Sequence, residues 1–126
     1  MKILIVDDEP HLRTLIHQAL EELEDDGVDL LTASNGEEAL ATIREERPNL
    51  VFLDVMMPKQ NGFDVCSTVK KEVGLSHIHV ILLTAKGQDF DRQRGQEVGA
   101  DLYMTKPFDP DALLAQARLV LGLTAR

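Results

Sequence analysis

Short runs of apolar residues alternate along this chain with longer stretches that repeat apolar side chains at helical spacing. The runs that predict strands are residues 3–6, 29–33, 50–54, 78–83 and 101–105. Parallel strands need a crossover connection, which is usually a helix and is right-handed. The alternation therefore predicts an α/β fold in which a five-stranded parallel sheet carries helices on both faces.

The helical stretches are marked by apolar stripes, caps and breakers. Residues 10–24 form the first, and the second starts at the capping-box spacing of Ser34 and Glu37 and stops before Pro48. The others are a segment from Phe63 to near Gly74, residues 87–98, and a last helix that opens at Asp109. Runs 3–6, 50–54 and 78–83 are the most apolar and fit the centre of the sheet, so the other two runs fit its edges.

Polar groups of matching chemistry follow four of the apolar runs. They are Asp7, Asp8, Asp54, Thr84 and Lys106. In an open parallel sheet the carboxyl ends of the strands meet at one rim, where such proteins hold their ligands. Clustered carboxylates repel one another unless a cation neutralises them. An acidic trio that faces a lysine therefore predicts a bound divalent ion and an incoming anion, for which we expect a phosphoryl group.

Each of these residues has a role in such chemistry. Magnesium prefers oxygen ligands and takes one or two carboxylates, so Asp8 and Asp54 are candidates for direct ligands and Asp7 for a ligand through water. Asp54 is the lone acid at the end of a central strand, which makes it the candidate nucleophile for an aspartyl-phosphate. Lys106 and the Thr84 hydroxyl can bind phosphoryl oxygens. The backbone N–H after Thr84, that of Ala85, is open to the same group.

Composition excludes several other classes of protein. The chain has 126 residues, which predicts one domain spanning 1–126. Its net charge of −9 disfavours direct binding to nucleic acid or to an anionic membrane. No apolar run could span a bilayer, and the first is too short for a signal peptide. Cys66 is the only cysteine, so an internal disulfide is excluded and a cytoplasmic location is expected.

At this point the chain resembles a two-component response-regulator receiver domain, of the single-domain kind that includes chemotaxis regulators. The resemblance covers residues 2 to about 122, in order and at family spacing. It rests on Val6-Asp7-Asp8-Glu9, Leu53-Asp54-Val55-Met56-Met57-Pro58, Asn61-Gly62, Leu83-Thr84-Ala85, Gly99-Ala100-Asp101 and Tyr103-Met104-Thr105-Lys106-Pro107-Phe108. A motif set this dense is specific, unlike a lone short pattern.

The resemblance implies a flavodoxin-like, doubly wound (βα)5 fold with strand order 2-1-3-4-5. It implies phosphorylation of Asp54 by a histidine kinase or a histidine phosphotransfer protein. It also implies Mg²⁺, or Mn²⁺ or another divalent ion, bound by Asp8, Asp54 and the backbone carbonyl of Met56, with Asp7 assisting. Lys106 would then bind a phosphoryl oxygen.

The resemblance further implies a switch made of Thr84 and Tyr103, in which the threonine moves toward the phosphoryl group and the ring turns inward. An output protein or domain would read the change on the face formed by the helix at 87–98, the strand at 101–105 and the last helix. The protein would signal as a monomer or as a phosphorylation-dependent dimer. It would catalyse only its own phosphorylation and dephosphorylation.

Other functions stay open on the sequence. A Mg²⁺-dependent phosphohydrolase with an aspartyl nucleophile would need a cap over its substrate, and the chain has no insertion long enough for one. A flavin-binding electron carrier lacks an evident phosphate loop, and a degenerate receiver would have lost one of the site residues. The chain ends soon after its last helix, which favours a free-standing protein over the receiver fragment of a larger multidomain regulator.

Overall fold

The computed structural model of the chain describes residues 1–57, 61–85, 96–106 and 109–123. It contains a five-stranded sheet in the order β2-β1-β3-β4-β5, and all four strand pairs are parallel. The strands are β1 (Lys2–Val6), β2 (Asp29–Ala33), β3 (Leu50–Asp54), β4 (His79–Ala85) and β5 (Leu102–Lys106). The predicted fold and strand order are therefore confirmed.

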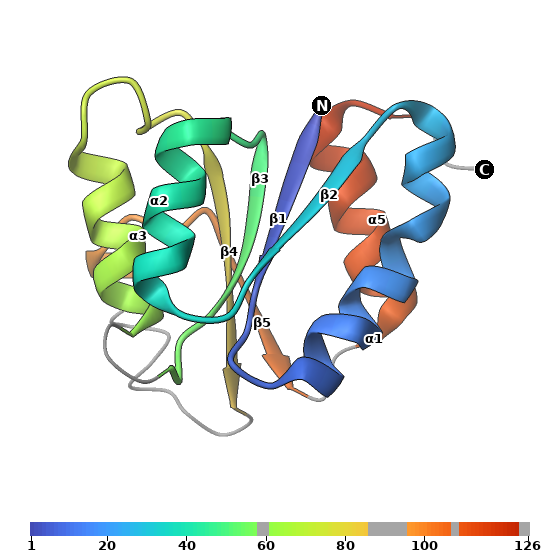
Figure 1. Cartoon of the computed structure of the whole chain (residues 1–126), viewed down its shortest axis with the longest axis horizontal. Helices are drawn as coiled ribbons and strands as arrows, with labels where there is room; N and C mark the ends of the chain where they lie inside the picture. Colours follow the sequence, from blue (N-terminus) through green and yellow to red (C-terminus); the bar gives the residue numbers. More distant parts are fainter. Residues whose placement is uncertain (58–60, 86–95, 107–108, 124–126) are drawn as a thin grey trace.

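The described residues include four α-helices, which lie on both faces of the sheet (Figure 1). Helices α2 (Gly36–Glu46) and α3 (Gly62–Lys71) cover one face, and α1 (Pro10–Leu20) and α5 (Pro110–Leu121) cover the other. Residues 87–95 of the helix predicted at 87–98 lie outside the described residues. Residues 96 and 97 are helical. No helix of the described part is long and apolar enough to cross a membrane.

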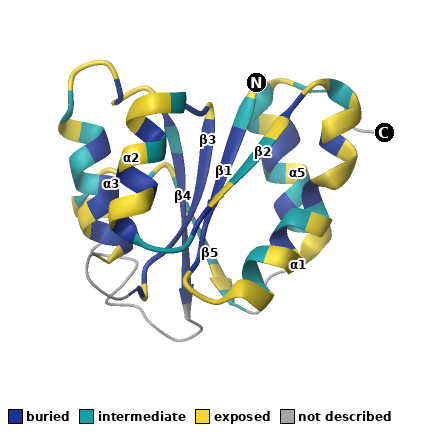
Figure 2. Cartoon of the chain, viewed as in Figure 1, coloured by how far each residue is buried: buried dark blue, intermediate teal, exposed yellow. Residues whose placement is uncertain are grey.

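The central strands separate two hydrophobic clusters. Alternate side chains of β1 and β3 point to opposite faces, so Leu4 and Val51 join the cluster under α2 and α3, while Ile5 and Phe52 join the cluster under α1 and α5. Every residue of β3 is buried, and Figure 2 shows the same burial along the middle of the sheet. Burial on both faces explains why these strands read as continuous apolar runs.

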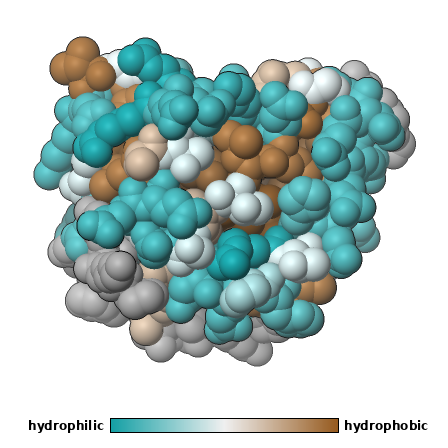
Figure 3. Space-filling model, viewed as in Figure 1, coloured by the Kyte–Doolittle hydropathy of each residue, from teal (hydrophilic) through white to brown (hydrophobic). Residues whose placement is uncertain are grey.

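The edge of the sheet at β2 is less completely covered. Leu30 and Leu31 are partly buried and pack against the two clusters. Figure 3 shows an apolar strip between two helical layers whose outer surfaces are polar. The sheet edges predicted for the more polar strands are thus confirmed at β2 and at β5.

Two helix boundaries differ from the sequence prediction. The helix predicted for 10–24 ends at Leu20, and a 3₁₀-helix, η1 (Glu21–Asp26), continues the chain. Five of its six residues are acidic, and negative charge is unfavourable at the carboxyl end of an α-helix. Buried Arg118 of α5 offsets part of this charge, since it donates to Glu22 at 2.7 Å and to Asp26 at 3.4 Å.

The cap of α2 also differs. The capping-box prediction placed Ser34 at the helix start, but the N-cap is Asn35, whose side chain accepts a hydrogen bond from the backbone N–H of Glu38 at 2.9 Å. The Ser34 hydroxyl instead bonds the Glu38 carboxylate at 3.0 Å. Asparagine is as good a cap as serine, so neighbouring candidates compete and the sequence alone does not decide between them.

All strands run toward one rim of the sheet, and the helices return the chain to the opposite rim. The first residue of β1 and the carboxyl end of α5 both lie at that opposite rim (Figure 1). Polar residues that follow the strands are therefore gathered far from both ends of the described chain.

Candidate functional site

The rim formed by the carboxyl ends of the strands brings the predicted site residues together. Asp7 and Asp8 follow β1, Asp54 is the last residue of β3, and Lys106 is the last residue of β5. Strand β4 extends two residues beyond the predicted end, so Thr84 lies inside it. In register, Thr84 pairs with Thr105 and Ala85 pairs with Lys106. The predicted convergence is confirmed.

Three carboxylates form a compact acidic cluster. One oxygen from each of Asp7, Asp8 and Asp54 lies within 4.8 Å of the others. Asp7 is fully buried and Asp54 nearly so, whereas Asp8 is exposed. Hard oxygen donors with one side open to solvent suit a small divalent cation that keeps some of its water. The donor set therefore fits Mg²⁺ or Mn²⁺.

Lys106 supplies the positive charge of the site. Its Nζ lies 3.1 Å from Asp54 Oδ1 and 3.4 Å from Asp7 Oδ2. Burial lowers the pKa of Lys106, but the charges and hydrogen bonds of the two carboxylates outweigh it and raise the pKa above its ordinary 10.5. The lysine is thus held cationic beside the acids.

The pKa of Asp54 is strongly perturbed. Burial raises its pKa, and the nearby charge of Asp7 raises it further. The charge and hydrogen bond of Lys106 and the backbone N–H of Met56 lower it in part, which leaves a pKa of about 6. Proteins place such perturbed groups at functional sites, where a cation or a reacting group compensates the cost. Asp54 therefore has the environment of a reactive carboxylate.

The backbone around Asp54 is tightly fixed. The backbone N–H of Met56 donates to Asp54 Oδ1 at 3.2 Å, and that of Val55 donates to the carbonyl of Leu83 at 3.1 Å. Gly62, the first residue of α3, packs directly on the Asp54 carbonyl, and a Cβ there would approach Val55 Cα to 2.8 Å. Only glycine fits this approach. Asn61-Gly62 is one of the motifs that carry the family resemblance, but the sequence gave no sign of this packing.

Thr84 carries an unpartnered hydroxyl. The residue is 1% exposed, and its Oγ1 has no hydrogen-bond partner among the described residues. A buried hydroxyl without a partner costs on the order of 1–3 kcal/mol. The site can recover this free energy when an acceptor, such as a phosphoryl oxygen, comes within reach of the hydroxyl.

The remaining predicted site residues are Tyr103, Ala85 and Met56. Tyr103 is half-buried on β5 and packs against the cluster under α2 and α3, whereas Leu102 and Met104 pack against the other cluster. The backbone of Ala85 ends β4, and the side chain of Met56 is 70% exposed beside Asp54. Pro107 and Phe108, which end the last of the quoted motifs, lie outside the described residues.

A contact that has no signature in the sequence holds the loop between β1 and α1. Arg13 of α1 donates from its guanidinium to the backbone carbonyl of Asp7 at 2.6 Å, and the backbone N–H of Glu9 donates to Asp7 Oδ1 at 2.9 Å. Arg13 stands on a helix with many polar residues, and nothing in its spacing separates it from a solvated charge.

Comparison with known proteins gives consistent matches. A family model described as response regulator receiver domain matches residues 3–118. The chain is 49% identical over 120 residues to the probable transcriptional regulator ycf27 of Pyropia yezoensis. It is 44% identical over 120 residues to the alkaline phosphatase synthesis transcriptional regulatory protein PhoP of Bacillus subtilis. Each match covers 95% of this chain. The chain spans only about half the length of these relatives, 47% of the ycf27 protein and 48% of PhoP.

Another relative is nearer in length, and solved structures share the fold. Protein PilG of Pseudomonas aeruginosa is 36% identical over 114 residues, which are 90% of this chain and 82% of PilG. The chemotaxis protein CheY4 of Vibrio cholerae superimposes with a TM-score of 0.83 at 32% identity, over 94% of this chain and 97% of CheY4. The response regulator DrrB of Thermotoga maritima gives 0.83 at 36% identity, over 96% of this chain and 52% of DrrB.

Proposed function

Because this chain belongs to the family of response regulator receiver domains, we propose that it is a phosphoryl-accepting signalling switch whose acceptor is Asp54. Receiver domains of response regulators interact with histidine kinases and output domains, and they signal rather than act as classical enzymes. The proposed donor is a histidine kinase or a histidine phosphotransfer protein. We also propose that residues 1–126 form one receiver domain.

One observation carries the proposal: a nearly buried carboxylate, Asp54, lies between an acidic pair and a lysine. Its Oδ1 is 3.1 Å from Lys106 Nζ, and its pKa is raised to about 6 by burial and by the charge of Asp7. Such a carboxylate is a costly feature for a purely structural residue. It is an apt nucleophile when neighbouring charges stabilise the transferred group.

The proposed metal site uses the acidic cluster. Asp8 and Asp54 would bind Mg²⁺ directly together with the Met56 carbonyl, and Asp7 would assist. Support comes from the 4.8 Å grouping of the three carboxylates and from the exposure of Asp8, which leaves room for water. When bound, the ion would neutralise the carboxylates and a phosphoryl oxygen.

In the proposed transfer, an Asp54 carboxylate oxygen forms a bond to phosphorus while the bond between phosphorus and the imidazole nitrogen of the donor breaks. The nitrogen keeps the bonding electrons and takes a proton from water. Lys106 binds one phosphoryl oxygen, and the Thr84 hydroxyl and the backbone N–H of Ala85 donate to others. In-line phosphoryl transfer depends mainly on this positioning and charge neutralisation.

The proposed switch follows from the unpartnered Thr84 hydroxyl. A phosphoryl group on Asp54 offers it an acceptor, so phosphorylation favours the state in which Thr84 moves toward the site. Tyr103, half-buried one strand away, then turns inward. The bias equals the difference in contact energy between the states, on the order of 1–3 kcal/mol. The output partner would bind the face that includes β5 and α5.

We expect the domain to work without touching nucleic acid, since its net charge is −9. A monomer and a phosphorylation-dependent dimer are both compatible with this mechanism. That the protein is free-standing stays a prediction, because the chain matches relatives of about twice its length as well as PilG. A cytoplasmic location also stays a prediction.

The test is intact mass spectrometry after incubation with acetyl phosphate and Mg²⁺, with Asp54→Ala as the control. We expect the wild type to gain one phosphoryl group, with acetate as the leaving group, only when the divalent ion is present. The control should gain none. Equal labelling of both proteins, or labelling that persists in EDTA, would refute Asp54 and the acidic cluster as the acceptor site.

A further inference from the structure

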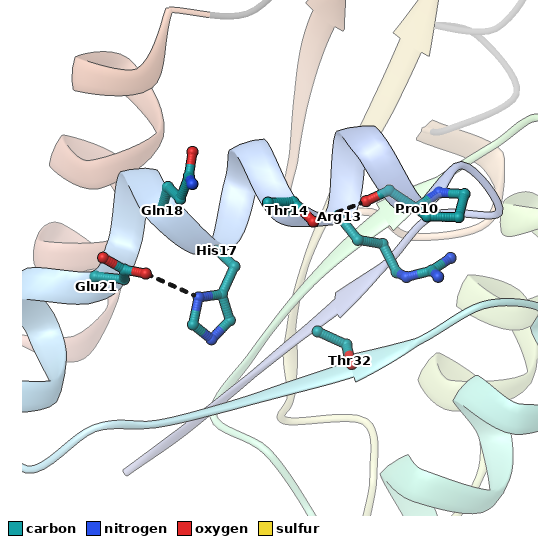
Figure 4. A pocket seen from close by; sticks show the side chains of 7 residues that line it. All are labelled: Pro10, Arg13, Thr14, His17, Gln18, Glu21 and Thr32. Carbon is teal, nitrogen blue, oxygen red and sulfur yellow. Dashed lines mark hydrogen bonds and ion pairs between the residues drawn. The ribbon is translucent and has the colours of Figure 1, made fainter.

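Arg13 connects the first helix to the acidic cluster. Its side chain lies on the side of α1 that faces β2, beside a groove with Thr32 across from it (Figure 4). From there its guanidinium donates to the backbone carbonyl of Asp7 at 2.6 Å. The backbone N–H of Arg13 also bonds the carbonyl of Glu9 at 3.1 Å, so the residue is anchored in the first turn of the helix.

The Asp7 carbonyl belongs to the peptide unit that joins Asp7 to Asp8. Because a peptide unit is planar, a bond that fixes its carbonyl oxygen also fixes the direction in which the chain enters Asp8. The other side of Asp7 is held already: its N–H donates to the Ala33 carbonyl at 3.3 Å, and its Oδ1 accepts from the backbone N–H of Glu9. Arg13 completes this set of restraints.

Asp8 depends on these backbone restraints. It is exposed, and its carboxylate has no hydrogen bond or ion pair to any described residue. Asp7 and Asp54 are instead held by Glu9, Met56 and Lys106. Of the three acids, Asp8 therefore has the most freedom to leave the cluster when the loop moves.

The guanidinium of Arg13 does not compete with a metal cation for the carboxylates of the acidic cluster. In the described part of the chain Arg13 forms no ion pair, and one of its guanidinium donors is bonded to a neutral carbonyl. An arginine paired with the carboxylates would have to be displaced before a metal could bind. The observed bond keeps the guanidinium away from the three carboxylates, of which only Asp7 and Asp54 pair with a cation among the described residues, namely Lys106.

We propose that Arg13 is a positioning residue for the divalent-ion site, acting through the Asp7–Asp8 peptide to hold the Asp8 carboxylate within the cluster. The proposal rests on the function inferred above, in which the acidic cluster binds Mg²⁺. Partners that orient metal ligands typically change metal affinity by about 10–100-fold when removed. Since Arg13 acts on the backbone rather than on the ligand side chain, we expect the lower end, about tenfold.

The experiment titrates Mn²⁺ into the whole chain, follows free Mn²⁺ by electron paramagnetic resonance, and obtains the Mg²⁺ affinity by competition. The proteins are the wild type, Arg13→Met, Arg13→Lys and Lys71→Met. Lys71 is an exposed cation at the end of α3 away from the site, so its removal changes net charge alone. We expect weaker binding by about tenfold in Arg13→Met, substantial recovery in Arg13→Lys, and wild-type affinity in Lys71→Met.

A second readout separates positioning from general damage to the fold. In the acetyl phosphate reaction, the Mg²⁺ concentration for half-maximal rate should rise in Arg13→Met by the same factor as the affinity falls. The rate at saturating Mg²⁺ should be unchanged. A lower saturated rate with unchanged metal dependence would refute the proposal.

The outcomes separate the two proposals. A wild type that binds neither ion refutes the metal site itself. If the wild type binds the ions and folded Arg13→Met binds them equally well or more tightly, the role of Arg13 is refuted. Tighter binding in Arg13→Met would mean that the guanidinium acts only as a charge that repels the cation. Urea unfolding in EDTA checks that the variants fold. If Arg13→Met does not fold, Arg13→Ala replaces it because alanine also lacks a side-chain donor, and wild-type affinity in that variant also refutes the proposal.

Discussion

Neutralising Asp54 should stabilise the protein when no divalent ion is present. The pKa of Asp54 is raised from an ordinary 3.8 to about 6, by burial first and by Asp7 second. A carboxyl whose pKa is raised in the folded state binds more protons when folded, so the stability of the wild type falls as pH rises through this range. The full penalty applies above about pH 6, and none applies below about pH 4.

The size of the effect follows from the shift. A change of about 2 pKa units corresponds to about 3 kcal/mol, at about 1.4 kcal/mol per unit. Asparagine keeps the shape and the oxygen that accepts from Met56 and Lys106, but it carries no charge. Its amide differs from a protonated carboxyl in hydrogen bonding, so we expect Asp54→Asn to gain about 1–3 kcal/mol near pH 7.

The measurement is urea unfolding followed by circular dichroism, in EDTA, at about pH 4 and about pH 7. Asp25→Asn is the matched control, because Asp25 is an exposed acid of η1 and its removal reports only the relief of the −9 net charge. Excess Mg²⁺ should then stabilise the wild type and leave Asp54→Asn unchanged. Any of three results would refute the reasoning: Asp54→Asn is no more stable than the wild type near pH 7, it is equally stabilised near pH 4, or Asp25→Asn shows the same gain in stability.

Two further substitutions test the surroundings of Asp54. Gly62→Ala should destabilise the fold by about 1–3 kcal/mol and slow labelling by acetyl phosphate, because the added Cβ would displace the Asp54–Val55 backbone. The control is Gly27→Ala, which has open space around the added Cβ and should leave labelling unchanged. Equal labelling rates in the two variants would contradict the prediction. Met56→Asn should shorten the lifetime of the phosphorylated form, because an exposed amide beside Asp54 can hydrogen-bond a hydrolytic water and a thioether cannot do so strongly. The lifetime is measured by loss of the added mass, and a lifetime equal to that of the wild type would count against the prediction.

The rim of the site could be predicted because strand ends are visible in the sequence. Asp54 and Lys106 each end an apolar run, and parallel strands necessarily bring such ends together. The burial of Thr84 could not be predicted, because β4 runs two residues past the predicted end. Strand ends depend on pairing with neighbouring strands, and a single sequence does not contain this information directly.

Other features depended on competition between similar side chains. Helix α1 ends at Leu20, directly before an acidic run, and the cap of α2 is Asn35 rather than Ser34. Both outcomes turn on free-energy differences of about 1 kcal/mol or less, which local patterns do not resolve. The bond from Arg13 to a backbone carbonyl has no sequence signature, because any carbonyl is chemically alike.

The described helices return the chain to the rim opposite the acidic cluster, which has a practical consequence for labelled forms of the protein. A dye, an affinity handle or a fused reporter placed near Met1 or Leu123 would sit across the full length of the strands from Asp54. Such an attachment leaves the approach of a donor protein open. It can register the phosphorylated state only through changes relayed along the strands and α5, so a signal from it would measure the switch itself rather than occupancy of the acceptor.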